Sequence, residues 1–204
     1  MMVVHHLRPS RAERILWLLE EIGLDYEVVT YERTPAFRSP PDLFEVHPLG
    51  KSPVVVKGDL VLVESGAIVE YLVENYAQDL APKPGDPARI PYLQWLHWSE
   101  GSAAAWLVMD LVVNSGLAPG LDPGPLAQSL PAEIGRALDW VESELAGRAF
   151  ACGEAFTAAD PMLGWTLGFA RDRGHAGERP AILAYLERIE ARPALERARQ
   201  RAAA

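Results

Sequence analysis

The pattern of the sequence changes once, near residue 77, and this change limits the chain to two differently built parts. Before that point short β-branched runs alternate with helical patterns, and after it no strand pattern occurs. The stretch AQDLAPKPGDPA (77–88) is rich in proline, glycine and aspartate, which is typical of a linker between domains. We therefore predict an α/β domain over residues 1–78, a linker over 79–87 and an all-α domain over 88–204.

The first part has the element order of a layered α/β domain. PVVVK and LVLV, joined by Gly58-Asp59, predict an antiparallel hairpin. The stretch RAERILWLLEEIG (11–23) repeats apolar residues at helical spacing and ends in glycine. The predicted strands are 3–7, 26–30, 53–57 and 60–63, and the predicted helices are 11–23, 42–46 and 65–76. The resulting order, β-α-β-α-β-β-α, predicts a sheet covered by helices.

The second part is helical throughout, which predicts an all-α domain. SGLAPGLDPGPL (115–126) interrupts its first two helices with several prolines and glycines. The predicted helices are 88–115, 126–147, 157–171, 178–191 and a short one from about 193.

Composition and charge exclude several classes of protein. The net charge of −9 is spread along the chain, whereas nucleic-acid-binding proteins carry a basic face. No apolar run reaches 18 residues, and the first residues lack the apolar core of a signal peptide, so we predict no membrane association and a cytoplasmic location. The single cysteine, Cys152, allows neither an internal disulfide nor a thiol-rich metal site, and we expect it to be a small buried filler.

A charged residue and a hydroxyl residue meet where a predicted strand gives way to a helix. In VESGAIVEYL, Glu64 and Ser65 stand at this junction, where free backbone N–H groups and the helix dipole favour an anion. A carboxylate beside such a site can receive an ammonium group, so the pair matches the two charged ends of an α-amino acid. The alternative is that Ser65 only caps the helix and Glu64 is solvated.

A second candidate segment lies just before the predicted strand 53–57. Pro53 cannot donate to a β-ladder, so it belongs at the start of the strand. A cis bond between Ser52 and Pro53 would expose the backbone of Ser52 to an extended, peptide-like ligand. Lys51 can then pair with a carboxylate at the other end of that ligand, or it is an ordinary surface lysine.

Ser10 begins the first predicted helix and has two competing interpretations. A hydroxyl at a helix N-terminus can donate a hydrogen bond to a thiolate. Lowering a thiol pKa of about 8.5 by about two units takes about 2.7 kcal/mol, which a charge-assisted hydrogen bond and a helix dipole can supply. However, Ser10 and Glu13 also form an S-x-x-E capping box, in which the serine side chain bonds the amide of Glu13.

Taken together, the sequence resembles the glutathione S-transferase family over its whole length, which implies a thioredoxin-like first domain and a helical second domain. The segments that carry the resemblance are PLGKSPVVV, VESGAI, FACGEAFTAADPML and HHLRPSRAERILWLLEEIGLDYE. The last is similar to the bacterial and fungal serine-type branch of the cytosolic enzymes. Within the third, Thr157 and Asp160 predict a second capping box, which we interpret as a folding element.

The resemblance implies reduced glutathione as the ligand and co-substrate, with no further cofactor and no metal. Glu64 and Ser65 then hold the γ-glutamyl group, and the backbone of Ser52, before Pro53, binds the cysteinyl part. Lys51 and Arg38 face the glycine carboxylate.

The resemblance leaves the catalytic residue open between two alignments. One places Leu7 in the catalytic serine position, and the other places Ser10 beside the position that faces the nucleophile. No tyrosine or cysteine occurs in residues 1–25, which excludes both tyrosine-type activation and cysteine chemistry. We predict Ser10 as the catalytic residue, supported by Arg11. Because strand faces alternate, at most one of the preceding histidines, His5 and His6, points to the site.

The helix over 90–111 is expected to provide the pocket for a second, hydrophobic substrate. The residues predicted for it are Trp98, Ala105, Trp106 and Met109. The resemblance implies a homodimer, in which Glu100 can reach the glutathione bound to the other subunit. We thus predict a glutathione transferase that conjugates glutathione to an electrophile. The alternatives are a glutathione-dependent peroxidase, isomerase or dehalogenase, and a non-catalytic protein of the same fold.

Overall fold

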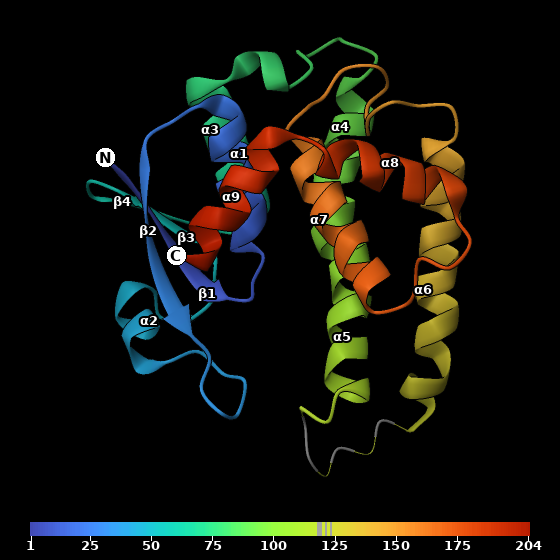
Figure 1. The fold of residues 1–204 in the computed structure, drawn as a ribbon, viewed down its shortest axis with the longest axis horizontal. Coiled ribbons are helices and arrows are strands. Elements are labelled where there is room, and N and C mark those ends of the chain that lie inside the picture. The colour runs from blue at the N-terminus through green and yellow to red at the C-terminus, as the bar shows by residue number, and fades with distance from the viewer. Residues whose placement is uncertain (118–119, 121, 123) are drawn as a thin grey trace. The chain divides into compact units, whose positions relative to one another are not determined.

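The computed structural model describes residues 1–117, 120, 122 and 124–204 (Figure 1). These form two compact units, one comprising Met1–Leu80 with Glu190–Ala204 (unit 1) and the other Ala81–Ile189 (unit 2). Unit 1 contains the four-stranded sheet and unit 2 is helical. The predicted fold class, a thioredoxin-like α/β part followed by an all-α part, is confirmed.

The sheet of unit 1 has the strand order β2-β1-β3-β4. Its strands are β1 (Met2–Arg8), β2 (Tyr26–Glu32), β3 (Val54–Lys57) and β4 (Leu60–Val63). β1 is parallel to β2, and β3 is antiparallel to both β1 and β4, which confirms the predicted hairpin. Since β1 and β4 therefore run in the same direction, they end at the same edge of the sheet. We call this edge the C-terminal edge of β1 and β4.

Two helices of unit 1 begin at this edge. α1 (Ala12–Ile22) follows β1, and α3 (Ser65–Tyr76) follows β4 directly. The two helices pack against each other, and α1 also packs on β1. The remaining elements before residue 81 are the short helix α2 (Pro41–Val46) and one 3₁₀ turn, Gln78–Leu80. The N-termini of α1 and α3, where unpaired backbone N–H groups gather, thus share one edge of the sheet.

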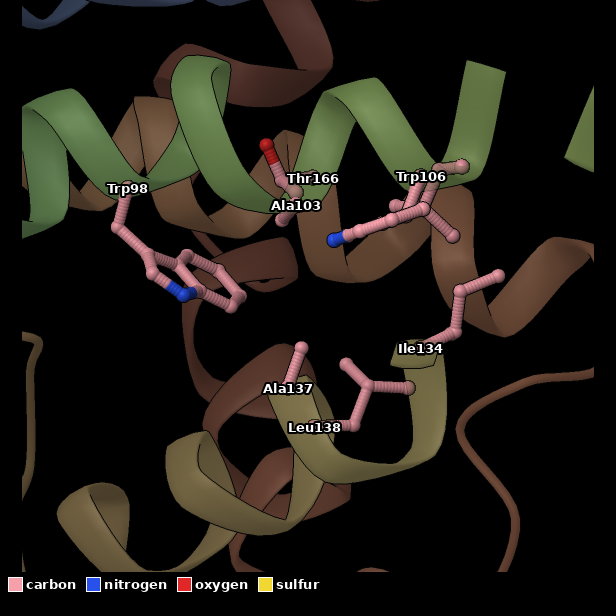
Figure 2. Close-up of a pocket in the computed structure, with 8 residues that line it drawn as sticks. Trp98, Ala103, Trp106, Ile134, Ala137, Leu138 and Thr166 are labelled. Atoms are coloured by element: carbon pink, nitrogen blue, oxygen red, sulfur yellow. The ribbon is translucent and has the colours of Figure 1, made fainter. Parts of the chain in front are cut away.

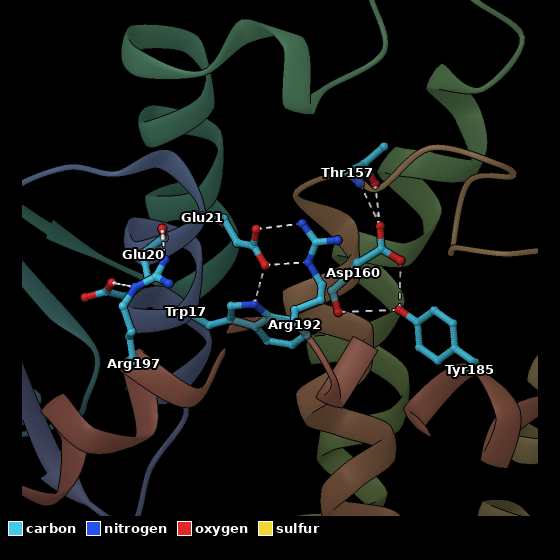
Figure 3. Close-up of polar contacts among 8 residues, drawn as sticks. All are labelled: Trp17, Glu20, Glu21, Thr157, Asp160, Tyr185, Arg192 and Arg197. Atoms are coloured by element: carbon cyan, nitrogen blue, oxygen red, sulfur yellow. Dashed lines mark hydrogen bonds and ion pairs between the residues drawn. The ribbon is translucent and has the colours of Figure 1, made fainter. Parts of the chain in front are cut away.

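The last helix, α9 (Pro193–Ala203), belongs to unit 1, although the sequence pattern groups it with the helices before it. It packs on α1 (Figure 1). Arg192 donates two hydrogen bonds to the carboxylate of Glu21, with Nε–Oε1 and Nη2–Oε2 distances of 2.6 and 2.7 Å (Figure 3). Trp17 donates its indole N–H to the same carboxylate. A bidentate pair of this kind fixes the orientation of both side chains, so it sets how α9 lies on α1.

Replacing Arg192 with alanine should destabilise unit 1 by about 1–2 kcal/mol, because the pair with Glu21 is hydrogen-bonded at both oxygens but partly open to solvent. Urea unfolding followed by circular dichroism measures this change. The matched control is Arg199→Ala, which removes a more exposed pair with Glu190 and should change stability by less than about 0.5 kcal/mol. Equal effects of the two substitutions would contradict the role of Arg192.

Unit 2 begins with a long helical segment that the sequence predicts as one regular helix over 88–115. The structure divides it into α4 (Arg89–Trp98), a π-helical segment (Ser99–Ala104) and α5 (Ala105–Asn114). At the change in winding, the hydroxyl of Ser99 donates to the carbonyl of Trp95 at 2.8 Å. The hydroxyl of Thr166 lies 3.5 Å from the carbonyl of Ser99, and its shorter hydrogen bond, at 3.0 Å, is to the carbonyl of Met162. Hydroxyl groups that enter the backbone ladder in this way disturb regular α-helical bonding.

The other helices of unit 2 are α6 (Gly124–Leu145), α7 (Ala159–Asp172) and α8 (Pro180–Glu190). They correspond to the predicted helices 126–147, 157–171 and 178–191. Residues 118–119, 121 and 123 of the predicted break at 115–126 lie outside the described residues. Over the rest of the chain, no helix combines the length and the apolar character needed to cross a membrane.

Asp160, in the first turn of α7, is the centre of a buried network (Figure 3). Its carboxylate accepts hydrogen bonds from the backbone N–H groups of Thr157 and Ala151 at 2.7 and 2.8 Å, and from the hydroxyl of Tyr185 at 2.9 Å. Burial raises the pKa of Asp160 to about 6, against the effect of these hydrogen bonds. The network ties the start of α7 to the preceding loop and to α8.

The predicted capping box at Thr157 and Asp160 is formed in one direction only. The Asp160 side chain reaches back to the Thr157 amide as predicted. In the other direction, the Asp160 amide donates to the backbone carbonyl of Thr157 and not to its hydroxyl, which instead donates to the Asp160 carboxylate. Tyr185 is a member of the network that the sequence pattern does not reveal.

Candidate functional site

Ser10 and Ser52 meet in a buried cluster at the C-terminal edge of β1 and β4. Their hydroxyl oxygens are 3.1 Å apart, and the residues are only 9% and 8% exposed. The hydroxyl of Ser52 donates to the carbonyl of His5 at 2.8 Å and accepts the amide of Leu7 at 3.1 Å. The side chain of Ser52 therefore continues the pairing between β1 and β3 beyond the last paired residues, and this holds the loop before β3 against the end of β1.

One of the two strand histidines belongs to this cluster. The Nδ1 atom of His6 lies 3.3 Å from the hydroxyl oxygen of Ser10, and His6 is fully buried. His5 points to the other face, where its Nδ1 lies 2.9 Å from the hydroxyl of Tyr31. Burial and the nearby positive charge of Arg8 lower the pKa of His6 to about 4. The imidazole is therefore neutral at physiological pH.

The predicted capping box at Ser10 and Glu13 is not formed as expected. The hydroxyl of Ser10 accepts the amide of Ala12 at 3.2 Å, while the amide of Glu13 donates to the backbone carbonyl of Ser10. Arg11, half-buried, occupies the N-cap position of α1 and makes no capping hydrogen bond through its side chain. Ser10 thus assists the helix start through a different amide, because the chain turns into α1 one residue later than the motif predicts.

The segment around Glu64 lies beside Ser52 and Pro53. Val54 pairs with Val63, so the residues just outside this pair, Pro53 and Glu64, are neighbours at the end of the hairpin. The Ser52–Pro53 bond is cis, the geometry considered for it from the sequence; the Arg8–Pro9 bond is also cis, which the sequence does not indicate.

Glu64 has an unusual backbone. Its φ of 68° lies in the region that favours glycine, at a cost of about 1–3 kcal/mol for other residues. Its side chain is exposed, whereas Ser65, the first residue of α3, is buried. The Glu64 carboxylate thus lies directly before the N-terminus of α3, and the backbone of Glu64 has a conformation that residues other than glycine rarely adopt.

Two cationic residues lie on neighbouring loops near the same edge. Lys51 directly precedes Ser52, and Arg38 lies in the loop between β2 and α2; both are exposed. The hydroxyl of Ser39 donates to the carbonyl of Gly50, which joins the two loops. Ser39 could not be identified from the sequence, because a lone serine in a loop carries no signal for a partner eleven residues away.

Unit 2 contains a small apolar pocket between the helical segment Arg89–Asn114, α6 and α7 (Figure 2). It has an empty volume of about 240 Å³, part of it open to solvent. Of the four residues predicted for a hydrophobic pocket, Trp98 and Trp106 line it, and Ala105 and Met109 are not among its lining residues. Its lining residues are Trp98, Ala103, Trp106, Leu107, Ile134, Ala137, Leu138 and Thr166. Glu100 lies in the π-helical segment and is half-buried.

Neither a reactive thiol nor a metal cluster is present in the described part of the chain. Burial raises the pKa of Cys152 to about 11, so its thiol is protonated at neutral pH. Among the described residues, no three histidine, cysteine, aspartate or glutamate side chains are grouped so that they could hold a metal ion. The groups that the structure places at this edge of the sheet are hydroxyl groups, the His6 imidazole, backbone amides and charged side chains.

Comparison with known proteins agrees with this geometry. Residues 1–74 match the family model of the glutathione S-transferase N-terminal domain, and residues 125–188 match that of the C-terminal domain. Glutathione S-transferase 3 of Schizosaccharomyces pombe is 35% identical over an alignment that covers 95% of this chain and 85% of the relative.

Solved structures show the same fold. A glutathione S-transferase from Actinobacillus pleuropneumoniae has a TM-score of 0.86 and 34% identity, with 100% of this chain and 93% of that chain covered. A glutathione transferase family member from Pseudomonas fluorescens, solved with two glutathione molecules bound, has a TM-score of 0.82 and 25% identity, with 97% and 91% covered. On these grounds the chain belongs to the glutathione S-transferase family.

Proposed function

We propose that this protein binds reduced glutathione at the C-terminal edge of β1 and β4 and stabilises its thiolate for attack on a hydrophobic electrophile. The observation that carries the proposal is the convergence of three features on this edge. They are the Ser10–Ser52 cluster, the loop at Ser52-Pro53 and the start of α3 at Glu64-Ser65. Together they offer a hydrogen-bond donor for the thiolate, a segment that can bind an extended peptide and a site for the charged groups of an α-amino acid.

Each part of glutathione has a matching group. The carboxylate of Glu64 receives the α-ammonium group, and Ser65 with the first amides of α3 receives the α-carboxylate. The backbone of Ser52 binds the cysteinyl part. Lys51 and Arg38 face the glycine carboxylate from their two loops, which the Ser39–Gly50 hydrogen bond holds together.

The thiol loses its proton to solvent, and the resulting thiolate accepts a hydrogen bond from Ser10. The dipole of α1 and the charge of Arg11 add to this stabilisation. The sulfur electron pair then forms the bond to the electrophilic carbon. The electrons of the bond that breaks leave with the leaving group or move onto the acceptor atom.

The second substrate and the assembly belong to the same proposal. We assign the electrophile to the α4–α5 segment, where Trp98 and Trp106 line the apolar pocket; Ala105 and Met109, the other two residues predicted for this substrate, lie outside the pocket lining. In a homodimer, Glu100 reaches the glutathione of the other subunit. The protein then acts in the cytoplasm as a detoxifying enzyme.

One observation favours a second candidate, a non-catalytic protein that binds glutathione. The hydroxyl of Ser10 already contacts three groups within the protein, namely Ala12, His6 and Ser52. If the Ser10 hydroxyl keeps these contacts when glutathione binds, it donates no hydrogen bond to the thiolate, and glutathione binds without activation. A peroxidase, isomerase or dehalogenase would use the same activated thiolate, so each of them also requires the Ser10 hydroxyl to exchange a contact within the protein for one with the thiolate.

Ser10→Ala separates these functions. If Ser10 activates the thiol, bound glutathione should form thiolate at a higher pH, and turnover should fall by about tenfold or more, which corresponds to about 1.4 kcal/mol. The dissociation constant should change by no more than about threefold. The measurement is thiolate ultraviolet absorbance of the glutathione complex between about pH 5 and pH 9, with free thiol ionising near 8.5 as reference.

The control is Ser143→Ala, which removes an exposed hydroxyl on α6 and should change none of the three quantities: the pH of thiolate formation, turnover and the dissociation constant. Both substitutions are compared per folded molecule, because loss of the contact with the Ala12 amide should also cost Ser10→Ala about 1 kcal/mol of stability. Binding without a thiolate shift in the parent protein would favour the non-catalytic candidate.

A further inference from the structure

His6 is a buried polar residue that the proposed function has not yet used. Its ring is fully buried, and its Nε2 atom has no hydrogen-bond partner within the described part of the chain. Leaving a buried polar atom unpaired costs about 1–3 kcal/mol, and an apolar residue at this position on β1 would avoid that cost. Its other nitrogen, Nδ1, contacts the hydroxyl of Ser10 at 3.3 Å. The ring is therefore attached to the site through Ser10.

The protons of the cluster can be assigned from its contacts. A serine hydroxyl has one proton and two acceptor positions. The proton of Ser52 is used on the carbonyl of His5, since a carbonyl can only accept. In the contact between Ser10 and Ser52, the proton must then come from Ser10. The second contact of Ser10, with the Ala12 amide, fills one of its acceptor positions.

The remaining contact fixes the state of His6. Because the only proton of Ser10 already points to Ser52, the Nδ1 atom of His6 must carry the proton and donate it to Ser10. The ring is neutral, so Nε2 is then the bare nitrogen, and it is this atom that lacks a partner. Both acceptor positions of Ser10 are now filled by N–H groups, one from His6 and one from Ala12.

We propose that His6 is a positioning residue for Ser10: its Nδ1–H fills the second acceptor position of the serine, so that the serine can offer a ligand only its proton. When a thiolate binds, it replaces Ser52 as the acceptor of the hydrogen bond that the Ser10 hydroxyl donates. With the other tautomer, Nδ1 would accept the proton of Ser10 and withdraw it from the thiolate. The inference rests on the proposed role of Ser10.

The tautomer can be measured directly in the parent protein. Nitrogen-15 chemical shifts of His6 should show a protonated Nδ1 and a bare Nε2, unchanged between about pH 5.5 and pH 9, because its pKa lies near 4. A protonated Nε2 with a bare Nδ1 would overturn the proposal. This measurement needs no substitution and therefore does not depend on whether a variant folds.

Substitutions test the effect on the thiol. His6→Leu removes the donor and should raise the pKa of bound glutathione thiol by about one unit, with the dissociation constant changed by no more than about threefold. His6→Asn keeps an N–H group near the position of Nδ1 and should restore most of the shift. The matched control is His5→Leu, because His5 lies on the other face of β1 and contacts Tyr31. An unchanged thiol pKa in His6→Leu would mean that the residue is only structural.

The double variant Ser10→Ala/His6→Leu distinguishes failure of this inference from failure of the proposed function. Because His6 acts through Ser10, the double variant should have the same thiol pKa as Ser10→Ala alone. Additive shifts would overturn the positioning role while leaving the role of Ser10 intact. If Ser10→Ala itself causes no shift, the proposed function of Ser10 fails and the role of His6 fails with it.

Discussion

Replacing Glu64 with glutamine is expected to weaken glutathione binding by about tenfold to a hundredfold. The substitution keeps the size of the side chain and removes its charge, so the α-ammonium group loses a charge-assisted hydrogen bond worth about 1.5–3 kcal/mol. The exposure of Glu64 favours the lower part of this range, because solvent screens the pair. Isothermal titration calorimetry with reduced glutathione measures the dissociation constant.

A ligand that lacks the α-amino group identifies the partner of Glu64. Deaminated glutathione should bind the parent protein and Glu64→Gln with the same affinity, since the interaction is absent in both complexes. The control variant is Glu74→Gln, an exposed glutamate near the other end of α3, which should leave glutathione affinity unchanged. Equal affinity of the parent and Glu64→Gln for glutathione itself would contradict the assignment of Glu64.

The strained backbone of Glu64 does not affect the comparison of the parent with Glu64→Gln. A residue at a φ of 68° without glycine's freedom is kept there by its surroundings, here the end of the β3–β4 hairpin and the start of α3. Glutamine meets the same steric restriction as glutamate, so the backbone cost cancels between the two. Any change in affinity then reports the charge alone.

Elements specified by nearby residues could be predicted from the sequence. β4 and α3 occupy the predicted residues, 60–63 and 65–76, because a β-branched run and a helical repeat meet there without overlap. Gly23 ends α1 as predicted, with a φ of 76° and its amide bonded to Leu19. In these cases backbone preference and side-chain spacing favour the same structure.

Contacts between distant residues could not be predicted in the same way. Arg192 and Glu21 are 171 positions apart, and the charge pattern of α9 suits a solvated helix as well as one packed on α1. The same limit applies within the site. The S-x-x-E pattern at Ser10 correctly locates the start of a helix, but the contacts with His6 and Ser52 come from the strand pairing, and they determine what the hydroxyl can do.

Replacing Asp160 with alanine should destabilise unit 2 by about 3 kcal/mol or more. The change leaves four buried donors without this acceptor: the amides of Thr157 and Ala151 and the hydroxyls of Thr157 and Tyr185. Each unpaired buried donor costs about 1–3 kcal/mol, and the loss of the buried charge offsets only part of the sum. Urea unfolding followed by circular dichroism and tryptophan fluorescence measures the effect.

Two further variants make this result specific. Asp172→Ala removes an exposed carboxylate at the end of the same helix and should change stability by less than about 0.5 kcal/mol. Tyr185→Phe removes one donor together with its need for an acceptor, so it should cost only about 1–2 kcal/mol. If Asp160→Ala costs no more than Tyr185→Phe, the carboxylate does not organise the network.

The pKa of Asp160 also fixes the sign of a pH effect. Its ordinary value is 3.8 and burial raises it to about 6, so between these values the folded protein holds a proton that the unfolded chain has released. By linkage, the contribution of Asp160 to stability decreases as the pH rises through this window. The side chain of the Asp160→Asn variant does not titrate, so its stability lacks this pH-dependent contribution. The free energy of unfolding of the parent minus that of Asp160→Asn should therefore decrease as the pH is raised from about 4 to about 6. An increase over this interval would mean that the hydrogen bonds, and not burial, determine the pKa.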